Sequence, residues 1–104
     1  MTITATVKNA IEATKVTSIN HTDDAASPAA ASYKLGYVPR YVCVMNVTDR
    51  IRQEYFVGMA ANNFINTTAA GTTTLATSGG LAVSGDTITF PVLQNKLFCV
   101  LAEG

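Results

Sequence analysis

The chain has 104 residues, with seven Lys and Arg against seven Asp and Glu, so its formal net charge is zero. This length is typical of one domain with its own hydrophobic core. A neutral chain without a local basic patch lacks the charge of a nucleic-acid-binding protein, and no apolar stretch is long enough to span a bilayer. Because 48% of the residues are hydrophobic, the composition also excludes intrinsic disorder.

Charged residues make up only 13% of the chain, and Thr, Ser and Asn take their place. A free monomer usually stays soluble through a charged surface and a net charge away from zero. Two interpretations stay open: a neutral polar surface, common among β proteins, or a subunit that covers much of its surface in an assembly. Residues 1–4 lack the basic start and apolar run of a signal peptide, so we expect synthesis in the cytoplasm.

Residues 1–31 differ in pattern from the rest of the chain. The weak alternation over residues 2–7 predicts a strand. Residues 9–14 form either one helical turn or the approach to a second strand over residues 16–19. Residues 20–32 are rich in turn formers and small residues, which predicts a loop. We therefore expect an N-terminal strand or arm followed by a loop.

From residue 32 onward the pattern is that of short strands separated by turns. After a short strand over residues 33–35, the apolar run over residues 41–45 predicts a strand buried on both faces. Residues 51–57 alternate between apolar and polar, and the turn formers of residues 46–49 join the two runs into a predicted hairpin.

The second half continues in the same way. Residues 58–66 are irregular, residues 72–76 predict a strand, and the turn at residues 84–86 predicts a second hairpin. The apolar run over residues 96–102 predicts a last strand in the middle of the core. About six to eight short antiparallel strands indicate an all-β fold, a compact β-sandwich or small barrel. We expect a single domain overall, with residues 1–31 as N-terminal strand or arm and loop, and residues 32–104 as its β-sandwich core.

Residues that carry chemistry are few. The single histidine, His21, lies in the predicted loop and is expected to face solvent, so nucleophilic catalysis has no evident base. One His and the two distant residues Cys43 and Cys99 do not form a zinc site. Asp23 and Asp24 lack the spaced ligands of a calcium loop and are expected to be solvated. We therefore predict no enzymatic activity, no cofactor and no metal.

Cysteine and tyrosine residues allow two further predictions. Cys43 and Cys99 lie in the two densest apolar runs, and in a reducing compartment we expect two buried free thiols. Whether the two strands are neighbours stays open. Tyr33, Tyr37 and Tyr41 are candidates for stacking against sugar rings, although packing in the core or at an interface is the commoner role of such tyrosines.

A series of short motifs follows residue 32. They are Tyr33-Lys34-Leu35-Gly36-Tyr37-Val38-Pro39-Arg40-Tyr41-Val42, Asn46-Val47-Thr48-Asp49-Arg50, Glu54-Tyr55-Phe56, Gly58-Met59, Ala69-Ala70-Gly71-Thr72 and Leu75-Ala76-Thr77-Ser78-Gly79-Gly80. This part of the chain resembles small structural proteins encoded in the genomes of tailed bacteriophages. Those proteins share a Gly-aromatic-x-Pro-Arg-Tyr-Val motif that leads into a strand, an Asn-x-Thr-Asp turn and an aromatic strand ending in Gly-Met. The resemblance does not extend to residues 1–31.

The resemblance implies a virion protein, and among virion roles we favour a capsid decoration (cement) protein that binds between capsomers. Its partners would be further copies of itself, in a homo-oligomer such as a trimer, and the major capsid protein, with neither nucleic acid nor membrane. It would be made in the host cytoplasm and reside on the capsid surface. A tail or head-tail connector component and a carbohydrate-binding β-sandwich module are the alternatives. Arg40, Arg50, Arg52 and Tyr37 are the candidate interface residues, since arginine makes directed contacts at interfaces.

Overall fold

The computed structural model describes residues 3–10 and 15–104, which form strands and turns without an α-helix. The ten strands are β1 (Ile3–Ala10), β2 (Val16–Asp23), β3 (Ala31–Lys34), β4 (Tyr41–Asn46), β5 (Ile51–Phe56), β6 (Phe64–Thr67), β7 (Thr73–Ala76), β8 (Ala82–Ser84), β9 (Thr87–Phe90) and β10 (Phe98–Glu103). All pair antiparallel, and the all-β sandwich is confirmed. The strand number exceeds the predicted six to eight because some strands have only three or four residues.

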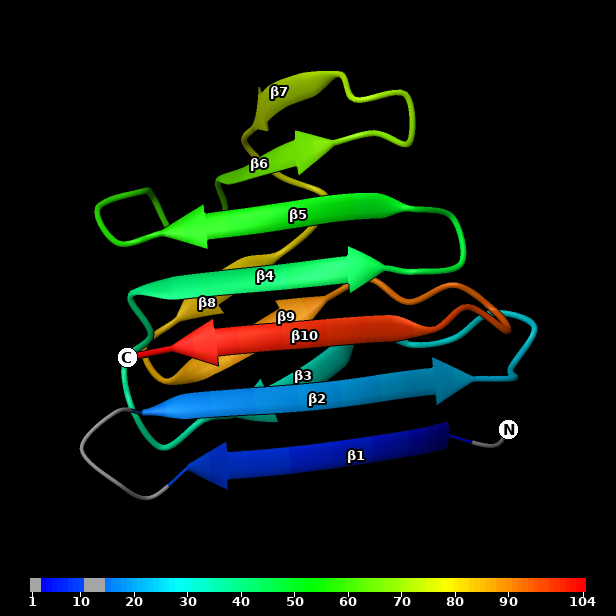
Figure 1. Cartoon of the computed structure of the whole chain (residues 1–104), viewed down its shortest axis with the longest axis horizontal. Helices are drawn as coiled ribbons and strands as arrows, with labels where there is room; N and C mark the ends of the chain where they lie inside the picture. Colours follow the sequence, from blue (N-terminus) through cyan, green and yellow to red (C-terminus); the bar gives the residue numbers. More distant parts are fainter. Residues whose placement is uncertain (1–2, 11–14) are drawn as a thin grey trace.

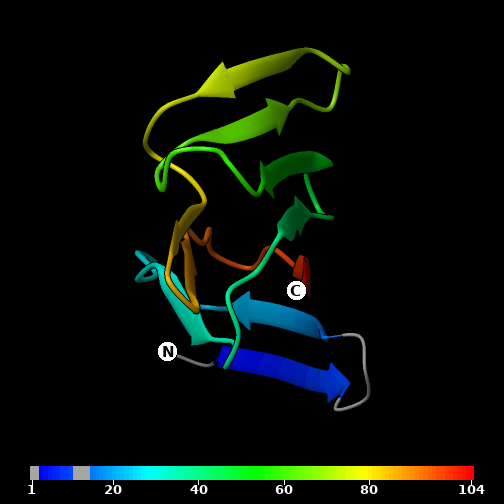
Figure 2. The same cartoon turned by 90° about the vertical axis from the view of Figure 1, so that its left-hand side faces the viewer.

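The strands form two layers. The large sheet has the order β1-β2-β10-β4-β5-β6-β7, and the small sheet has the order β3-β9-β8. Figure 1 looks onto the large sheet, with the small sheet behind its β2, β10 and β4 strands. Figure 2 shows the two layers from the side and shows β6 and β7 extending beyond the small sheet. The last strand, β10, lies between β2 and β4, so its predicted central position is confirmed.

The core lies between the two sheets. Successive side chains of a strand point to opposite faces, and β4 alternates accordingly: Val42 and Val44 are buried, whereas Cys43 is only half-buried. The prediction that this strand is buried on both faces is therefore wrong for the single chain, because the small sheet covers only one side. The buried apolar side chains are Ile19, Ala31, Leu35, Val42, Val44, Phe64, Leu81, Val83, Ile88, Phe90, Val92, Phe98, Val100 and Ala102.

The N-terminal segment is more regular than its composition predicts. β1 pairs with β2 as an edge strand of the large sheet, and β2 pairs on its other side with β10. The predicted loop over residues 20–32 shrinks to residues 24–30, because β2 continues to Asp23 and β3 begins at Ala31. Strand pairing overrides the turn preference of this stretch: Asn20 pairs with both β1 and β10, and Thr22 pairs with β1. Residues 11–14, part of the predicted helical turn, lie outside the described residues.

Both predicted hairpins are confirmed. In the β4–β5 turn, the Asn46 side chain accepts a hydrogen bond from the Asp49 N–H at 3.1 Å and donates one to the Asp49 carboxylate at 3.0 Å. Lys96 forms an ion pair with the same carboxylate at 3.1 Å. The hydrogen bonds from Lys96 and Asn46 lower the pKa of Asp49. In the second hairpin, β8 pairs with β9 so that Val83 lies opposite Ile88. The predicted irregular stretch ends earlier than expected, since β6 begins at Phe64.

Replacing Phe90 should test the core most directly. Its ring is fully buried and packs against the rings of Tyr33, Phe98 and His21, with centroids 5.9–6.2 Å away. Phe90→Ala is expected to lower the free energy of unfolding by about 3–5 kcal/mol, measured by urea denaturation. The matched control is Phe56→Ala, because that ring is 44% exposed. Equal losses in the two variants would contradict this description of the core.

Candidate interaction surface

The side of the large sheet that faces away from the small sheet is the candidate functional surface, and we call it the open face. Within the described residues no other part of the chain packs on it (Figures 1 and 2). The alternation of the strands and their register place a mixed set of side chains there. On the five strands β10, β4, β5, β6 and β7 they are Cys99, Leu101, Glu103, Tyr41, Cys43, Met45, Arg52, Glu54, Phe56, Ile65, Thr67, Thr73 and Leu75.

A mostly apolar row crosses the middle of the open face. In register order it runs from Leu101 through Cys43, Glu54 and Ile65 to Leu75, one residue from each of five neighbouring strands. Leu101 is 38% exposed and Leu75 is 63% exposed. Single exposed apolar side chains are ordinary, whereas apolar side chains that recur on neighbouring strands of one uncovered face indicate a candidate site of contact. The row makes the open face a candidate contact surface.

The charged groups at the centre of the open face neutralise each other. The Arg52 Nε lies 3.0 Å from the Glu54 Oε1, and the Tyr41 hydroxyl donates a hydrogen bond of 2.8 Å to the Glu54 Oε2. Burial, together with this hydrogen bond, raises the pKa of Tyr41, so its hydroxyl stays protonated at neutral pH. The Tyr41 ring packs on that of Phe56 at 5.1 Å. A partner covering this centre would meet satisfied polar groups and little net charge.

Both cysteines lie on the open face as free thiols. Cys43 pairs in register with Leu101, and Cys99 pairs with Met45, so the two residues lie on neighbouring strands. The prediction of free thiols is confirmed, whereas the prediction that they are buried is wrong: both are half-buried. Their strands are apolar on two faces, but only one face is covered. Partial burial raises the pKa of Cys43, which makes its thiol a weak nucleophile.

The structure does not gather the candidate arginines into one cluster. Arg52 lies on the open face, with 48% of its side chain exposed. Arg40 precedes β4 and is exposed, and its carbonyl accepts a hydrogen bond from Val57 at 2.8 Å. Arg50 lies in the turn at the other end of the same hairpin, with a φ of 58°. Arg40 and Arg50 therefore lie at opposite ends of the β4–β5 hairpin, and Arg52 lies on the sheet between them.

The tyrosines are held by contacts within the chain. The Tyr37 hydroxyl donates a hydrogen bond to the Ala102 carbonyl at 3.0 Å and lies 2.7 Å from the Thr17 hydroxyl, and its ring packs against the core. Tyr33 also packs against the core, whereas Tyr41 belongs to the open face. The three rings therefore do not form one stacking platform for a sugar.

His21 and Asp23 are buried, contrary to prediction. They lie on the covered face of β2, where His21 is 5% exposed and Asp23 is 1% exposed. The His21 Nδ1 lies 2.6 Å from the Tyr33 hydroxyl, and the ring meets Phe90 edge-on. The Asp23 carboxylate accepts a hydrogen bond from the Ala25 N–H at 2.9 Å. Polar neighbours in the sequence indicated a loop, but these residues continue the alternation of a paired strand.

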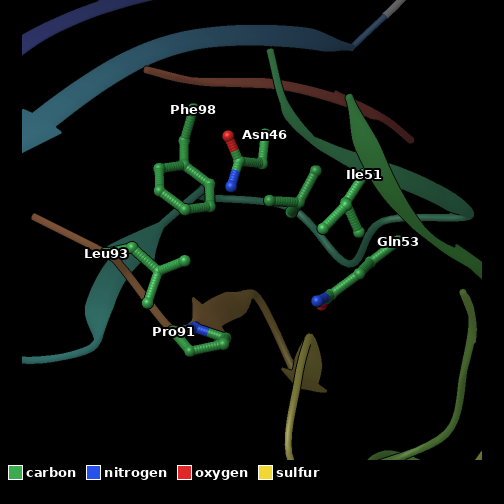
Figure 3. A pocket seen from close by; sticks show the side chains of 7 residues that line it. Asn46, Ile51, Gln53, Pro91, Leu93 and Phe98 are labelled. Atoms are coloured by element: carbon green, nitrogen blue, oxygen red, sulfur yellow. The ribbon is translucent and has the colours of Figure 1, made fainter. Parts of the chain in front are cut away.

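Two pockets lie away from the open face. The first, of about 150 Å³, lies between the covered face of β4 and β5 and the segment after β9 (Figure 3). Its lining is mostly apolar, and its two amide side chains, Asn46 and Gln53, already bond to Asp49 and to the Leu81 N–H. The second pocket, of about 290 Å³, is lined in part by His21 and Asp23. Among the described residues no group of three His, Cys, Asp or Glu side chains is placed to hold a metal ion.

Compared with known protein families, with curated proteins and with solved structures, the chain matches none. The described part also contains no helix of the length and apolarity needed to cross a membrane.

The buried histidine predicts a pH dependence of stability. Burial lowers the pKa of His21 below its usual 6.5, and the charge of Asp23 opposes this only in part. The unfolded chain therefore takes up the proton first, so the free energy of unfolding is fully retained above about pH 6.5 and decreases as the pH falls below it.

In His21→Asn this dependence should flatten, because an amide can keep a hydrogen bond to Tyr33 but does not titrate. Urea denaturation between about pH 5 and 7.5 measures both proteins, a window above that in which the carboxylates titrate. An unchanged slope in the variant would contradict the assignment.

Proposed function

We propose that the protein is a structural subunit of a bacteriophage virion, a capsid decoration protein that binds as a homo-oligomer between capsomers, and that its open face is covered in the assembled particle. It acts by binding and performs no chemistry. The proposal combines the resemblance of residues 33–103 to phage structural proteins with the character of the open face. Arg40 and Arg50, exposed at the two ends of the β4–β5 hairpin, are suited to polar contacts around the rim of that face.

One observation carries the proposal. The apolar run on β4 has the composition of a strand with cover on both faces, yet the single chain covers only one. A second cover supplied by another molecule would account for the side chains that remain half-buried or exposed, such as Met45 and Leu101. The low charge of the chain supports the same conclusion, since the cores of interfaces are depleted of charged residues.

The dimensions of the molecule also support it. The principal extents are 38 × 30 × 20 Å, and the large sheet lies across the two longer ones (Figure 1). A face of this size can supply the roughly 800 Å² that each partner contributes to a standard interface. If each oligomer makes several weak contacts with the shell at once, the overall affinity is much higher than that of a single contact.

The decisive experiment uses capsids of the same phage that lack the protein. Purified protein is mixed with them, and the bound fraction is measured after sedimentation. We expect saturable binding with a fixed number of copies per capsomer. Binding to isolated tails or connectors, with none to capsids, would overturn the capsid role and favour the alternative virion position. Absence of saturable binding to every particle would overturn the proposal.

A pair of matched variants tests the surface. Leu101→Glu places a charge in the middle of the open face and should weaken capsid binding at least tenfold, about 1.4 kcal/mol or more. Val38→Glu is the control, because Val38 is 69% exposed in the connection between β3 and β4 and does not belong to the open face. Equal binding by the two variants would show that the open face is not the contact.

A further inference from the structure

The large sheet ends at β7 in an edge strand without protection. Thr73, Thr74 and Leu75 are exposed, and no charged residue occurs between Glu54 and Asp86. Nor does any proline occur in that interval. Natural edge strands are usually blunted by charges, prolines, bulges or a covering segment, because their free N–H and C=O groups otherwise pair with another chain.

The other edges of the two sheets carry such devices. β8 has three residues, and its Val83 N–H donates a hydrogen bond of 2.9 Å to the Ala61 carbonyl, so the connection between β5 and β6 occupies that edge. β3 is short and ends in Lys34, and β1 contains Lys8. Among the edge strands of the described sheets, only β7 has neither a charged residue nor another segment bonded to its outer edge.

The register identifies the backbone groups that β7 leaves free. The Thr68 N–H donates a hydrogen bond of 3.0 Å to the Thr72 carbonyl, next to the Thr67–Thr73 pair. Antiparallel strands alternate between bonded and non-bonded pairs, so Thr74 bonds to β6. The N–H and C=O groups of Thr73 and Leu75 therefore point away from the sheet.

We propose that β7 pairs antiparallel with β7 of a second copy about a two-fold axis, which joins the large sheets of two molecules into one. When two identical strands pair antiparallel, the free N–H groups of each lie opposite the free C=O groups of the other. β7 contains no charged residue, so its pairing with a second β7 brings no like charges together. The pairing closes on itself, unlike a β7–β1 contact, which would propagate from copy to copy. It depends on the chain alone and holds whether or not the virion role is correct.

Four residues make a small contact, so the dimer forms reversibly and depends on concentration. Sedimentation velocity of the full chain over a range of concentrations should therefore show monomer and dimer in exchange. Amide hydrogen exchange followed by NMR reports the edge without any substitution. The amides of Thr73 and Leu75 should exchange at least about tenfold more slowly at high than at low concentration.

Three variants assign the contact. Thr73→Pro removes an N–H at the free edge and leaves the backbone hydrogen bonds to β6 intact, so this variant should stay monomeric where the natural chain dimerises. Thr67→Ala is the matched control, because it removes the same hydroxyl contact, 3.4 Å between the Thr67 and Thr73 Oγ1 atoms, yet leaves the edge free. It should dimerise normally. Leu75→Lys, which puts like charges at the contact, serves as a second disrupting variant if Thr73→Pro does not fold.

Several results would overturn this proposal. They are a monomer at every concentration, a dimer that survives both Thr73→Pro and Leu75→Lys, and oligomers that keep growing through a β7–β1 contact. A dimer abolished by Leu101→Glu with unchanged exchange at Thr73 and Leu75 would place the contact on the open face instead. Capsid binding is measured separately from dimerisation. A monomeric variant that still binds capsids would contradict a role of the β7 contact in decoration but not the virion role itself.

Discussion

One-sided packing is the constraint on which the rest of this structure depends. The small sheet covers the middle of the large sheet, and the aromatic rings of Phe90, Phe98 and Tyr33 fill the space between them. Three strands cannot cover both faces of a seven-stranded sheet, so one face stays open. On that face the strands retain apolar side chains, Leu101 and Ile65 among them. An exposed surface of this kind is stable in a subunit whose neighbours supply the missing layer.

This arrangement gives a structural reason for the low charge of the chain, because a surface with few unpaired charges is easier to bury. On the open face Arg52 and Glu54 form an ion pair within the chain, and the Tyr41 hydroxyl donates a hydrogen bond to the second carboxylate oxygen of Glu54. Covering these groups does not strand a lone charge, which would cost several kcal/mol. The centre of the open face can therefore be buried by a neighbour at a modest desolvation cost, in keeping with the assembly role that we propose.

Much of the fold could be predicted from the sequence because turn chemistry and alternation are local. Asn46 and Asp49 form the expected turn, and the last apolar run lies in the middle of the large sheet. His21 was missed because its neighbours favour a loop, while its burial is decided by the pairing of β2 with β10, which is distant in the chain. The strand over residues 41–45 was assigned two covered faces because composition cannot tell a cover within the chain from one supplied by a partner.

The candidate surface was less predictable than the fold. Of the residues predicted for an interface, Arg52 lies on the open face, while Tyr37 packs against the core. The row from Leu101 to Leu75 could not be found beforehand, because it joins five strands and exists only once their register is known.

The central claim is that a neighbour covers the open face, and the two native cysteines report on it directly. Cys43 and Cys99 are the only thiols of the chain, and both lie there. The rate of their alkylation by a maleimide can be compared between the free protein and protein bound to capsids. If a neighbour covers the open face, both thiols should be strongly protected in the particle. Alkylation at the same rate in the free and bound states would contradict it.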